Sequence, residues 1–281
     1  MPSYSPTFDL GDFQIRRLGF GAMRITGDGV WGPPRDERAA VRVLQRAVEL
    51  GVNFIDTADS YGPFVSEELI AKALYPYPDG LLVATKAGLM RDGPNKWRPN
   101  ARPEHLVERC KSSLKRLKLD RIDLLQLHRF DEKVPADEFL GQLAELQQQG
   151  YVRHLGLSEV TVAQIEQARQ HFEVVSIQNK YNLTERQWED ELQWCRERGI
   201  GFVPWYPLGA GALDHGGLQA VAKTHGKTPY QVAIAWLLHH APNLLPIPGT
   251  SSVAHLEENV AAREIELSEE DLDRLSAKVE A

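Results

Sequence analysis

The fold is decided by a stretch that reads LLVATK at 81–86, PEHLVERCKSSLKRLKL at 103–119 and IDLLQLH at 122–128. The first and last segments are short, nearly continuous apolar runs, which is typical of strands buried on both faces. The middle segment repeats its apolar residues at helical spacing, and Pro103 suits the first turn of a helix. The stretch therefore predicts two parallel strands joined by a crossover helix.

The same alternation continues on both sides of this stretch. Further strands are expected at 17–23, 52–57, 152–158, 174–178, 201–206 and 243–248, and further helices at 35–50, 136–150 and 185–199. Eight parallel strands alternating with amphipathic helices favour an α/β fold, a closed (β/α)8 TIM barrel rather than an open sheet. We also expect an N-terminal β-hairpin around 8–18 and an additional C-terminal helix from Ser268.

Turn and cap residues support these boundaries. Gly51, Gly150 and Gly199 stand where helices are expected to end. Residues with the capping-box form mark helix starts: Thr161 with Gln164, Thr184 with Gln187 and Thr228 with Gln231. Neither a linker nor a low-complexity tract interrupts the pattern, so one barrel domain is expected over 1–281.

The composition narrows the class of partner. The chain carries a formal net charge of −7, so it lacks the excess of Lys and Arg with which proteins bind nucleic acid. Its apolar runs fall short of the roughly 20 residues that span a bilayer, and its first residues lack the pattern of a signal peptide. We therefore expect a cytoplasmic protein without a nucleic-acid or membrane partner.

The two cysteines, Cys110 and Cys195, stand in expected helices without a CxxC motif. This arrangement indicates reduced packing residues rather than a disulfide or a metal site. No metal is expected.

Ionisable residues stand near the ends of three consecutive expected strands. Asp56, Lys86 and His128 occupy these places, and Tyr61 follows Asp56 in the next loop. Because the carboxyl ends of barrel strands meet at one mouth, where catalytic groups are held, the four side chains should converge. Each residue alone is more often structural, but the set together is hard to explain by packing.

These groups suit proton transfer coupled to charge development on oxygen. A phenol is a poor acid at neutral pH unless its anion is stabilised. Lys86 would place a positive charge beside Tyr61, and Asp56 would orient Lys86 and keep it charged. A neutral His128 could then hydrogen-bond a carbonyl oxygen and hold it against Tyr61.

These residues, with the segments around them, resemble the aldo-keto reductase superfamily. The segment GVNFIDTADSYG at 51–62, followed by SEEL at 66–69, looks like its first signature. Further similar pieces are TK at 85–86, LQLH at 125–128, GLS at 156–158, QN at 178–179, PLG at 207–209, IPGTSS at 247–252 and EEN at 257–259. The resemblance implies a catalytic tetrad of Asp56, Tyr61, Lys86 and His128. It also implies NADPH-dependent reduction of aldehydes or ketones, with Tyr61 as the general acid.

The resemblance further implies a set of cofactor-binding residues. Ser158 and Gln178 would hold the nicotinamide carboxamide, and Trp205 would stack on the ring. Trp205-Tyr206 stands where many relatives have Tyr-Ser, so the hydrogen bonds beside the ring are expected to differ. The full set is Gly21, Ala22, Met23, Asp56, Ser158, Gln178, Trp205, Tyr206, Pro207, Leu208, Gly209, Gly211, Gly249, Thr250, Ser251, His255, Glu258 and Asn259.

The turn at 249–252 precedes a helix, a place where such barrels often bind phosphate through helix amides. This suits the extra phosphate of NADPH. Gly249 and His255 stand where some branches of the family have Lys and Arg. We expect NADPH because hydroxyls and helix amides still bind phosphate, and use of NADH stays open.

The expected substrate pocket is open. The chain stops at Ala281, soon after the last helix, so the long C-terminal specificity loop of some relatives is not expected. Trp31, Phe64 and Trp97 are candidate aromatic walls, Trp97 within a long insertion at 88–102. The IPGTSS ending is most similar to the bacterial branch that includes pyridoxal reductases. Pyridoxal is therefore one candidate, while other aromatic or aliphatic aldehydes, dicarbonyls and quinone-like compounds fit equally well.

Two other functions stay open from the sequence. Barrels of this family also serve as channel-associated proteins, so the chain could be a non-catalytic NADPH-binding sensor or regulatory subunit. Lys86 could instead form a Schiff base in a lyase. Metal-dependent hydrolysis is less favoured, because Asp56 and His128 alone form no recognisable ligand set. The intact tetrad favours a reductase, expected to be a monomer or weak oligomer that binds a small carbonyl substrate.

Overall fold

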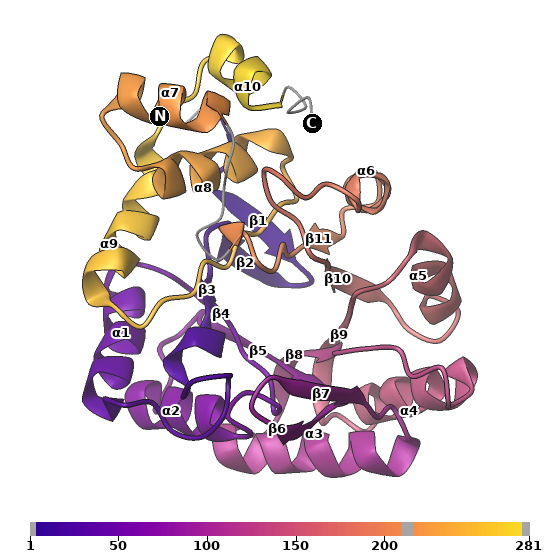
Figure 1. The fold of residues 1–281 in the computed structure, drawn as a ribbon. Coiled ribbons are helices and arrows are strands. Elements are labelled where there is room, and N and C mark those ends of the chain that lie inside the picture. The colour runs from indigo at the N-terminus through magenta and orange to yellow at the C-terminus, as the bar shows by residue number, and fades with distance from the viewer. Residues whose placement is uncertain (1–3, 210–215, 277–281) are drawn as a thin grey trace.

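The computed structural model describes residues 4–209 and 216–276, arranged around a central parallel sheet (Figure 1). Its seven strands run in the spatial order β11, β10, β9, β8, β5, β4 and β3, and each neighbouring pair is parallel. Their bounds are Phe20–Gly21 (β3), Phe54–Asp56 (β4), Leu82–Ala87 (β5), Ile122–Leu127 (β8), Val152–Ser158 (β9), Val174–Gln178 (β10) and Gly201–Phe202 (β11).

Helices surround this sheet on its outer side, as Figure 1 shows. They are α1 (Glu37–Glu49), α2 (Val65–Leu74), α3 (Pro103–Leu117), α4 (Ala136–Gln148), α5 (Val162–Ala168), α6 (Glu189–Arg196), α7 (Gly216–His225), α8 (Pro229–His240), α9 (Val253–Ala261) and α10 (Glu269–Ser276), with the 3-10 helices η1 (Ala22–Ile25) and η3 (Ala262–Glu264). The apolar faces of the helices pack on the sheet in one continuous core. The predicted (β/α)8 barrel and its C-terminal helix are confirmed.

The expected strand at 243–248 does not form as a regular strand. Pro246 and Pro248 lack the amide hydrogen that a sheet ladder needs. The segment still closes the barrel, because the amide of Leu245 donates to the carbonyl of Phe202 at 2.9 Å and the amide of Gly19 donates to the carbonyl of Pro246 at 2.9 Å. It therefore lies between β11 and β3, where the eighth strand of a barrel belongs.

The expected N-terminal hairpin is present as β1 (Thr7–Leu10) and β2 (Phe13–Arg16), which pair antiparallel. Leu10 and Ile15 of this hairpin are buried in one cluster with interior side chains of the barrel, including Phe54, Leu82 and Leu124. The hairpin thus contributes to the apolar core inside the barrel. The polar residues that follow these interior side chains lie at the opposite end of the barrel, at the carboxyl ends of β4, β5 and β8.

Most expected helix boundaries hold. Thr161 and Thr228 form capping boxes with Gln164 and Gln231 as predicted, and Pro103 lies in the first turn of α3. The prediction for Thr184 is wrong, since α6 begins only at Glu189 with Trp188 as its N-cap. The hydroxyl of Thr184 instead donates to the side-chain oxygen of Asn182 at 2.9 Å, and this local turn delays the helix.

The two cysteines are buried and unpaired. Burial raises the pKa of each thiol, Cys110 and Cys195, to about 12, which keeps both protonated and unreactive at neutral pH. Among the described residues, none of the helices has the length and apolar character to cross a bilayer.

Candidate active site

The two-residue period of the strands places polar side chains at the mouth of the barrel. In three strands an interior core residue is followed two positions later by a polar one: Phe54 by Asp56, Ala84 by Lys86 and Leu124 by Gln126. Alternate residues of a strand point to the same face. The polar side chains therefore share the interior face with the core, one layer closer to the mouth.

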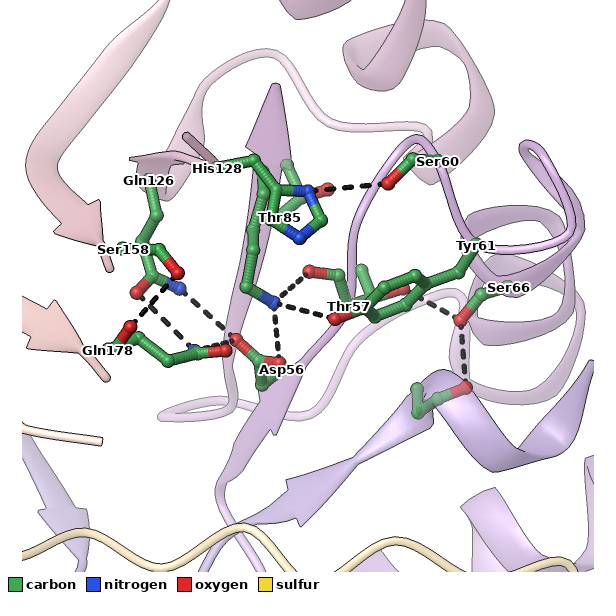
Figure 2. Close-up of polar contacts among 12 residues, drawn as sticks. Asp56, Thr57, Ser60, Tyr61, Ser66, Thr85, Gln126, His128, Ser158 and Gln178 are labelled. Atoms are coloured by element: carbon green, nitrogen blue, oxygen red, sulfur yellow. Dashed lines mark hydrogen bonds and ion pairs between the residues drawn. The ribbon is translucent and has the colours of Figure 1, made fainter. Parts of the chain in front are cut away.

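Asp56 is the centre of a buried hydrogen-bond network (Figure 2). Its Oδ2 lies 2.6 Å from Lys86 Nζ, and its Oδ1 accepts from Gln178 Nε2 at 2.8 Å and Gln126 Nε2 at 3.1 Å. Lys86 Nζ also donates to the carbonyl oxygen of Thr57 at 2.8 Å. A buried ion pair is tolerated only with such additional hydrogen bonds, because both charges have lost their water.

Tyr61 and His128 complete the set that the sequence predicted. Lys86 Nζ lies 3.4 Å from the hydroxyl of Tyr61, and the ring of His128 packs edge-on to that of Tyr61 at a centroid distance of 5.9 Å. Nδ1 of His128 lies 3.3 Å from Ser60 Oγ, which leaves Nε2 as the nitrogen able to bind a substrate oxygen. The structure thus brings all four predicted residues together.

Burial sets the charge states of these groups. Burial raises the pKa of Tyr61, and the positive charge of Lys86 opposes that rise. The phenol is therefore protonated at neutral pH, as a proton donor must be. Burial alone would lower the pKa of Lys86, but Asp56 and Tyr61 outweigh it and the pKa is raised. Burial, together with the charges of Lys86 and Arg129, holds the pKa of His128 well below its usual value, so its ring is neutral.

The loop that carries Tyr61 is fixed at several points. Thr57 Oγ1 and Ser66 Oγ are hydrogen-bonded at 2.7 Å inside the core (Figure 2). The amide of Asp59 donates to the carbonyl of Lys86 at 3.2 Å. Gly62 has a φ of 104°, a conformation that favours glycine, so the chain turns sharply after Tyr61. These contacts hold the phenol against Lys86.

The insertion at 88–102 forms a hairpin of β6 (Leu89–Gly93) and β7 (Lys96–Pro99) beside the mouth. Trp97 of this hairpin packs edge-on to Tyr61 at 6.4 Å and to His128 at 6.5 Å. The guanidinium of Arg91 lies 3.6 Å from the Trp97 ring centre and donates to the carbonyl of Ser60 at 3.1 Å. Trp97 therefore forms a wall beside Tyr61 and His128.

The mouth opens into a cavity of about 1140 Å³. Besides Tyr61, His128 and Trp97, it is lined by most of the predicted cofactor-binding residues, namely Gly21, Met23, Asp56, Ser158, Gln178, Trp205, Tyr206, Pro207, Leu208, Gly249, Thr250, Ser251, His255, Glu258 and Asn259. Ala22 and Gly209 are chain neighbours of lining residues but do not line it themselves. Gly211 lies outside the described residues.

Two predicted pocket residues lie elsewhere. The ring of Phe64 packs between the guanidinium groups of Arg109 and Arg116, at 5.1 and 4.3 Å, on the helix side of the loop. Trp31 covers Arg91 at 5.7 Å and stays 37% exposed. Neither is among the lining residues of the cavity. An aromatic residue near a signature motif does not by itself reveal which side of a loop its ring takes.

Two charged residues near Ser158 and Trp205 were not predicted from the sequence. Arg129, which follows His128, lines the cavity and donates from NH1 to Ser158 Oγ at 3.0 Å. Glu159, which follows Ser158, accepts from the indole nitrogen of Trp205 at 2.6 Å. Their position next to predicted residues was the only signal in the sequence. This hydrogen bond to Glu159 fixes the orientation of the Trp205 ring.

The far end of the cavity lies at the N-terminus of α9. Ser252 caps α9, whose N-terminal amides lie beside the lining residues Thr250 and Ser251. A Cβ at Gly249 would come within 2.4 Å of the carbonyl oxygen of Gly21, so a basic side chain has no room at 249. Arg24 lines the same cavity, and its side chain lies 3.5 Å from that Cβ position. The cavity therefore offers a ring-binding end and an anion-binding end, which fits a dinucleotide.

A metal centre is not suggested by the geometry. Within residues 4–209 and 216–276, no group of three or more His, Cys, Asp or Glu side chains is placed to hold an ion.

Comparisons with known proteins identify the family. The model of the aldo/keto reductase family matches residues 17–280. A pyridoxine 4-dehydrogenase of Escherichia coli is 46% identical over 278 residues, which cover 96% of this chain and 97% of the relative. An uncharacterized oxidoreductase of Schizosaccharomyces pombe is 51% identical over 270 residues, covering 95% of this chain and 88% of the relative.

Solved structures agree. A thermostable aldo-keto reductase in complex with the inhibitor epalrestat superimposes with a TM-score of 0.85 at 32% identity, covering 97% of this chain and 98% of that chain. An aldo-keto reductase of Klebsiella pneumoniae in complex with NADPH gives a TM-score of 0.81 at 27% identity, with coverages of 96% and 93%. On the family match over residues 17–280 and these relatives, the chain belongs to the aldo/keto reductase family.

Proposed function

We propose that the protein is an NADPH-dependent reductase that converts aldehydes or ketones to alcohols, with Tyr61 as the general acid. The observation that carries the proposal is the chain from Asp56 through Lys86 to Tyr61, with spacings of 2.6 and 3.4 Å, which ends at a large cavity. Family membership and the relatives solved with NADP or NADPH support the same cofactor.

The site residues divide the chemistry between them. When bound, NADPH supplies a hydride to the carbonyl carbon. Nε2 of His128 donates a hydrogen bond to the carbonyl oxygen and holds it near the hydroxyl of Tyr61. Tyr61 gives its proton to that oxygen, and Lys86 stabilises the phenolate that results. Asp56 keeps Lys86 charged and in place during this step.

The cavity has residues that would hold the cofactor with its ring at the end near Tyr61. Trp205 would provide the stacking face, and Ser158 and Gln178 would face the carboxamide. Thr250, Ser251 and the N-terminal amides of α9 would receive the extra phosphate. Arg24 would add the cation that neither Gly249 nor His255 provides in this chain.

The substrate class follows from the open cavity and from the relative in Escherichia coli that is named as a pyridoxine 4-dehydrogenase. Pyridoxal and other aromatic aldehydes are the first candidates, because Trp97 offers an aromatic wall over Tyr61. The acidic chain acts in the cytoplasm as a monomer or weak oligomer, without a membrane or nucleic-acid partner.

The test is oxidation of NADPH, and separately of NADH, with a panel of aldehydes that includes pyridoxal. We expect turnover by the wild type and a loss of roughly 100- to 10,000-fold in Tyr61→Phe, the range that general acid catalysis contributes. The phenylalanine keeps the ring, so NADPH should still quench the tryptophan fluorescence of the variant. Tight NADPH binding without turnover of any aldehyde would instead indicate a sensor or regulatory subunit. Substantial activity in Tyr61→Phe would refute the role of Tyr61.

A further inference from the structure

The hydrogen-bond donors of Ser158 and Gln178 are already used within the protein. Nε2 of Gln178 donates to Asp56 Oδ1 at 2.8 Å and reaches Gln126 Oε1 at 3.5 Å. Asp56 can only accept, so the amide nitrogen of Gln178 must face it. The hydroxyl of Ser158 donates to the carbonyl of Gln178 at 2.9 Å (Figure 2). Both residues therefore present acceptors, not donors, to the cavity.

A carboxamide needs both kinds of partner. Its amino group can donate to the free Oε1 of Gln178, but its oxygen needs a donor. Nearby donors are occupied or out of reach. The indole nitrogen of Trp205 donates to Glu159 at 2.6 Å, and Asn179, whose side-chain nitrogen donates to the carbonyl of Val160 at 2.9 Å, is fully buried and does not line the cavity. An unsatisfied carbonyl oxygen in such a site is costly.

Arg129 is the donor that is left. Its NH1 group is anchored to the carbonyl of His128 at 2.6 Å and to Ser158 Oγ at 3.0 Å. Its Nε and NH2 groups have no hydrogen-bond partner among the described residues, and the side chain lines the cavity. The guanidinium lies 6.0 Å from the centre of the Trp205 ring, the stacking face of the proposed site.

We propose that Arg129 binds the carboxamide oxygen of the nicotinamide and thereby sets the orientation of the ring over Trp205. The inference rests on the proposed function and assigns the cofactor a contact that Ser158 and Gln178 cannot provide. Because the guanidinium is positively charged, it also disfavours the positively charged ring of NADP⁺ relative to the neutral ring of NADPH. Arg129 thus favours binding of the reduced cofactor and release of the oxidised one.

A change of one atom in the cofactor tests the contact. Thionicotinamide adenine dinucleotide phosphate carries sulfur, a weak acceptor, in place of the carboxamide oxygen. Wild type should bind it roughly tenfold or more weakly than NADP⁺, since a hydrogen bond from a charged donor is lost. In Arg129→Met the two ligands should bind nearly equally. An equal penalty in wild type and variant would overturn the proposal, because the donor would then lie elsewhere.

The charge effect gives a second readout. The ratio of dissociation constants, NADP⁺ over NADPH, should fall roughly tenfold in Arg129→Met because repulsion of the oxidised ring is removed. Arg129→Lys keeps the charge and should keep the ratio close to that of the wild type. If the ratio is the same in all three proteins, the proposal fails. Adenosine diphosphoribose carrying the extra phosphate, which has no nicotinamide, should bind wild type and both variants alike.

A substrate role for Arg129 is the competing outcome. A carboxylated benzaldehyde and its methyl ester form a matched pair for this comparison. If Arg129→Met changes the ratio of kcat/KM between them while the cofactor constants stay unchanged, Arg129 binds an anionic substituent of the substrate and the proposal is overturned. The binding measurements need no turnover. Failure of the wild type to bind NADPH would refute the proposed function itself, a result distinct from loss of the Arg129 effect.

Discussion

Two buried polar networks lie on opposite sides of the same strand. Lys86 of β5 points into the barrel mouth and pairs with Asp56, whereas its neighbour Thr85 points outward and donates to Glu67 Oε1 at 2.6 Å. We call the second group the outer cluster; its members are Asp59, Glu67, Thr85, Arg109 and Arg116. Both networks bury carboxylates, but they differ in how completely those carboxylates are satisfied.

The inner network is fully paired. Both oxygens of Asp56 accept short hydrogen bonds. In the outer cluster, Glu67 is held by Arg116 at 2.6 Å, but Oδ1 of Asp59 is buried without a partner in the part of the chain that the structure describes, and its Oδ2 lies 4.0 Å from Arg109. Both oxygens of Glu67 are paired as well, by Thr85 and Arg116, so the two networks differ at Asp59 and not at every outer carboxylate. The outer cluster packs the loop against α3 and tolerates an imperfect partner.

The largest expected effect comes from breaking the inner network. Lys86→Met removes the charge that stabilises the Tyr61 phenolate, and we expect kcat to fall at least roughly 1,000-fold. It also leaves Asp56 without its ion-pair partner, at a cost of about 3–5 kcal/mol in the free energy of unfolding. Aldehyde reduction and urea unfolding measure the two effects separately.

The matched control is the double variant Lys86→Met with Asp56→Asn. Removing both charges should recover much of the lost stability, because no unpaired carboxylate stays buried. It should recover none of the activity. If the double variant is less stable than Lys86→Met alone, the ion pair is not the source of the destabilisation.

Breaking the outer cluster should affect stability and leave chemistry intact. Glu67→Gln keeps an acceptor for Thr85 but removes the buried partner of Arg116, so we expect a loss of about 2–4 kcal/mol in the free energy of unfolding. Glu67 does not line the cavity. The kcat of the folded variant should therefore stay within about twofold of the wild type, as expected for a change away from the active site. A large fall in kcat would show that the two networks are coupled through β5.

The sequence predicted the inner network better than the outer cluster. Asp56, Lys86 and His128 end apolar strands, and strand ends of a barrel meet at one mouth whatever the details of packing. Asp59 and Glu67 lie in the same signature segment, but a pattern of apolar residues does not show which outward side chains will pair. Phe64 was misplaced for the same reason, since its ring turned toward Arg109 and Arg116.

Local chemistry explains the other differences. The eighth strand was expected from its apolar residues, but Pro246 and Pro248 remove the amides of a regular ladder. The hairpin in the insertion at 88–102 has no strong apolar alternation, and Trp97 alone pointed to a role at the mouth. Arg129 and Glu159 were not predicted because their roles depend on which donors and acceptors of Ser158 and Gln178 are still unpaired. Only the three-dimensional structure shows which of these groups are paired.

The smallest expected effect sharpens the contrast between Asp56 and Asp59. Burial, and next the negative charge of Glu67, raise the pKa of Asp59 to about 8. The folded chain then keeps this proton while an unfolded Asp loses it near pH ~4, so stability falls as the pH rises between the two values. Asp59→Asn removes this dependence. Its advantage in the free energy of unfolding should grow by about 1.4 kcal/mol for each pH unit of that window, because one proton is involved. Thermal melts across the pH range measure it. If Asn is less stable than Asp at every pH, Arg109 already holds an ionised Asp59, and the two carboxylates are satisfied alike.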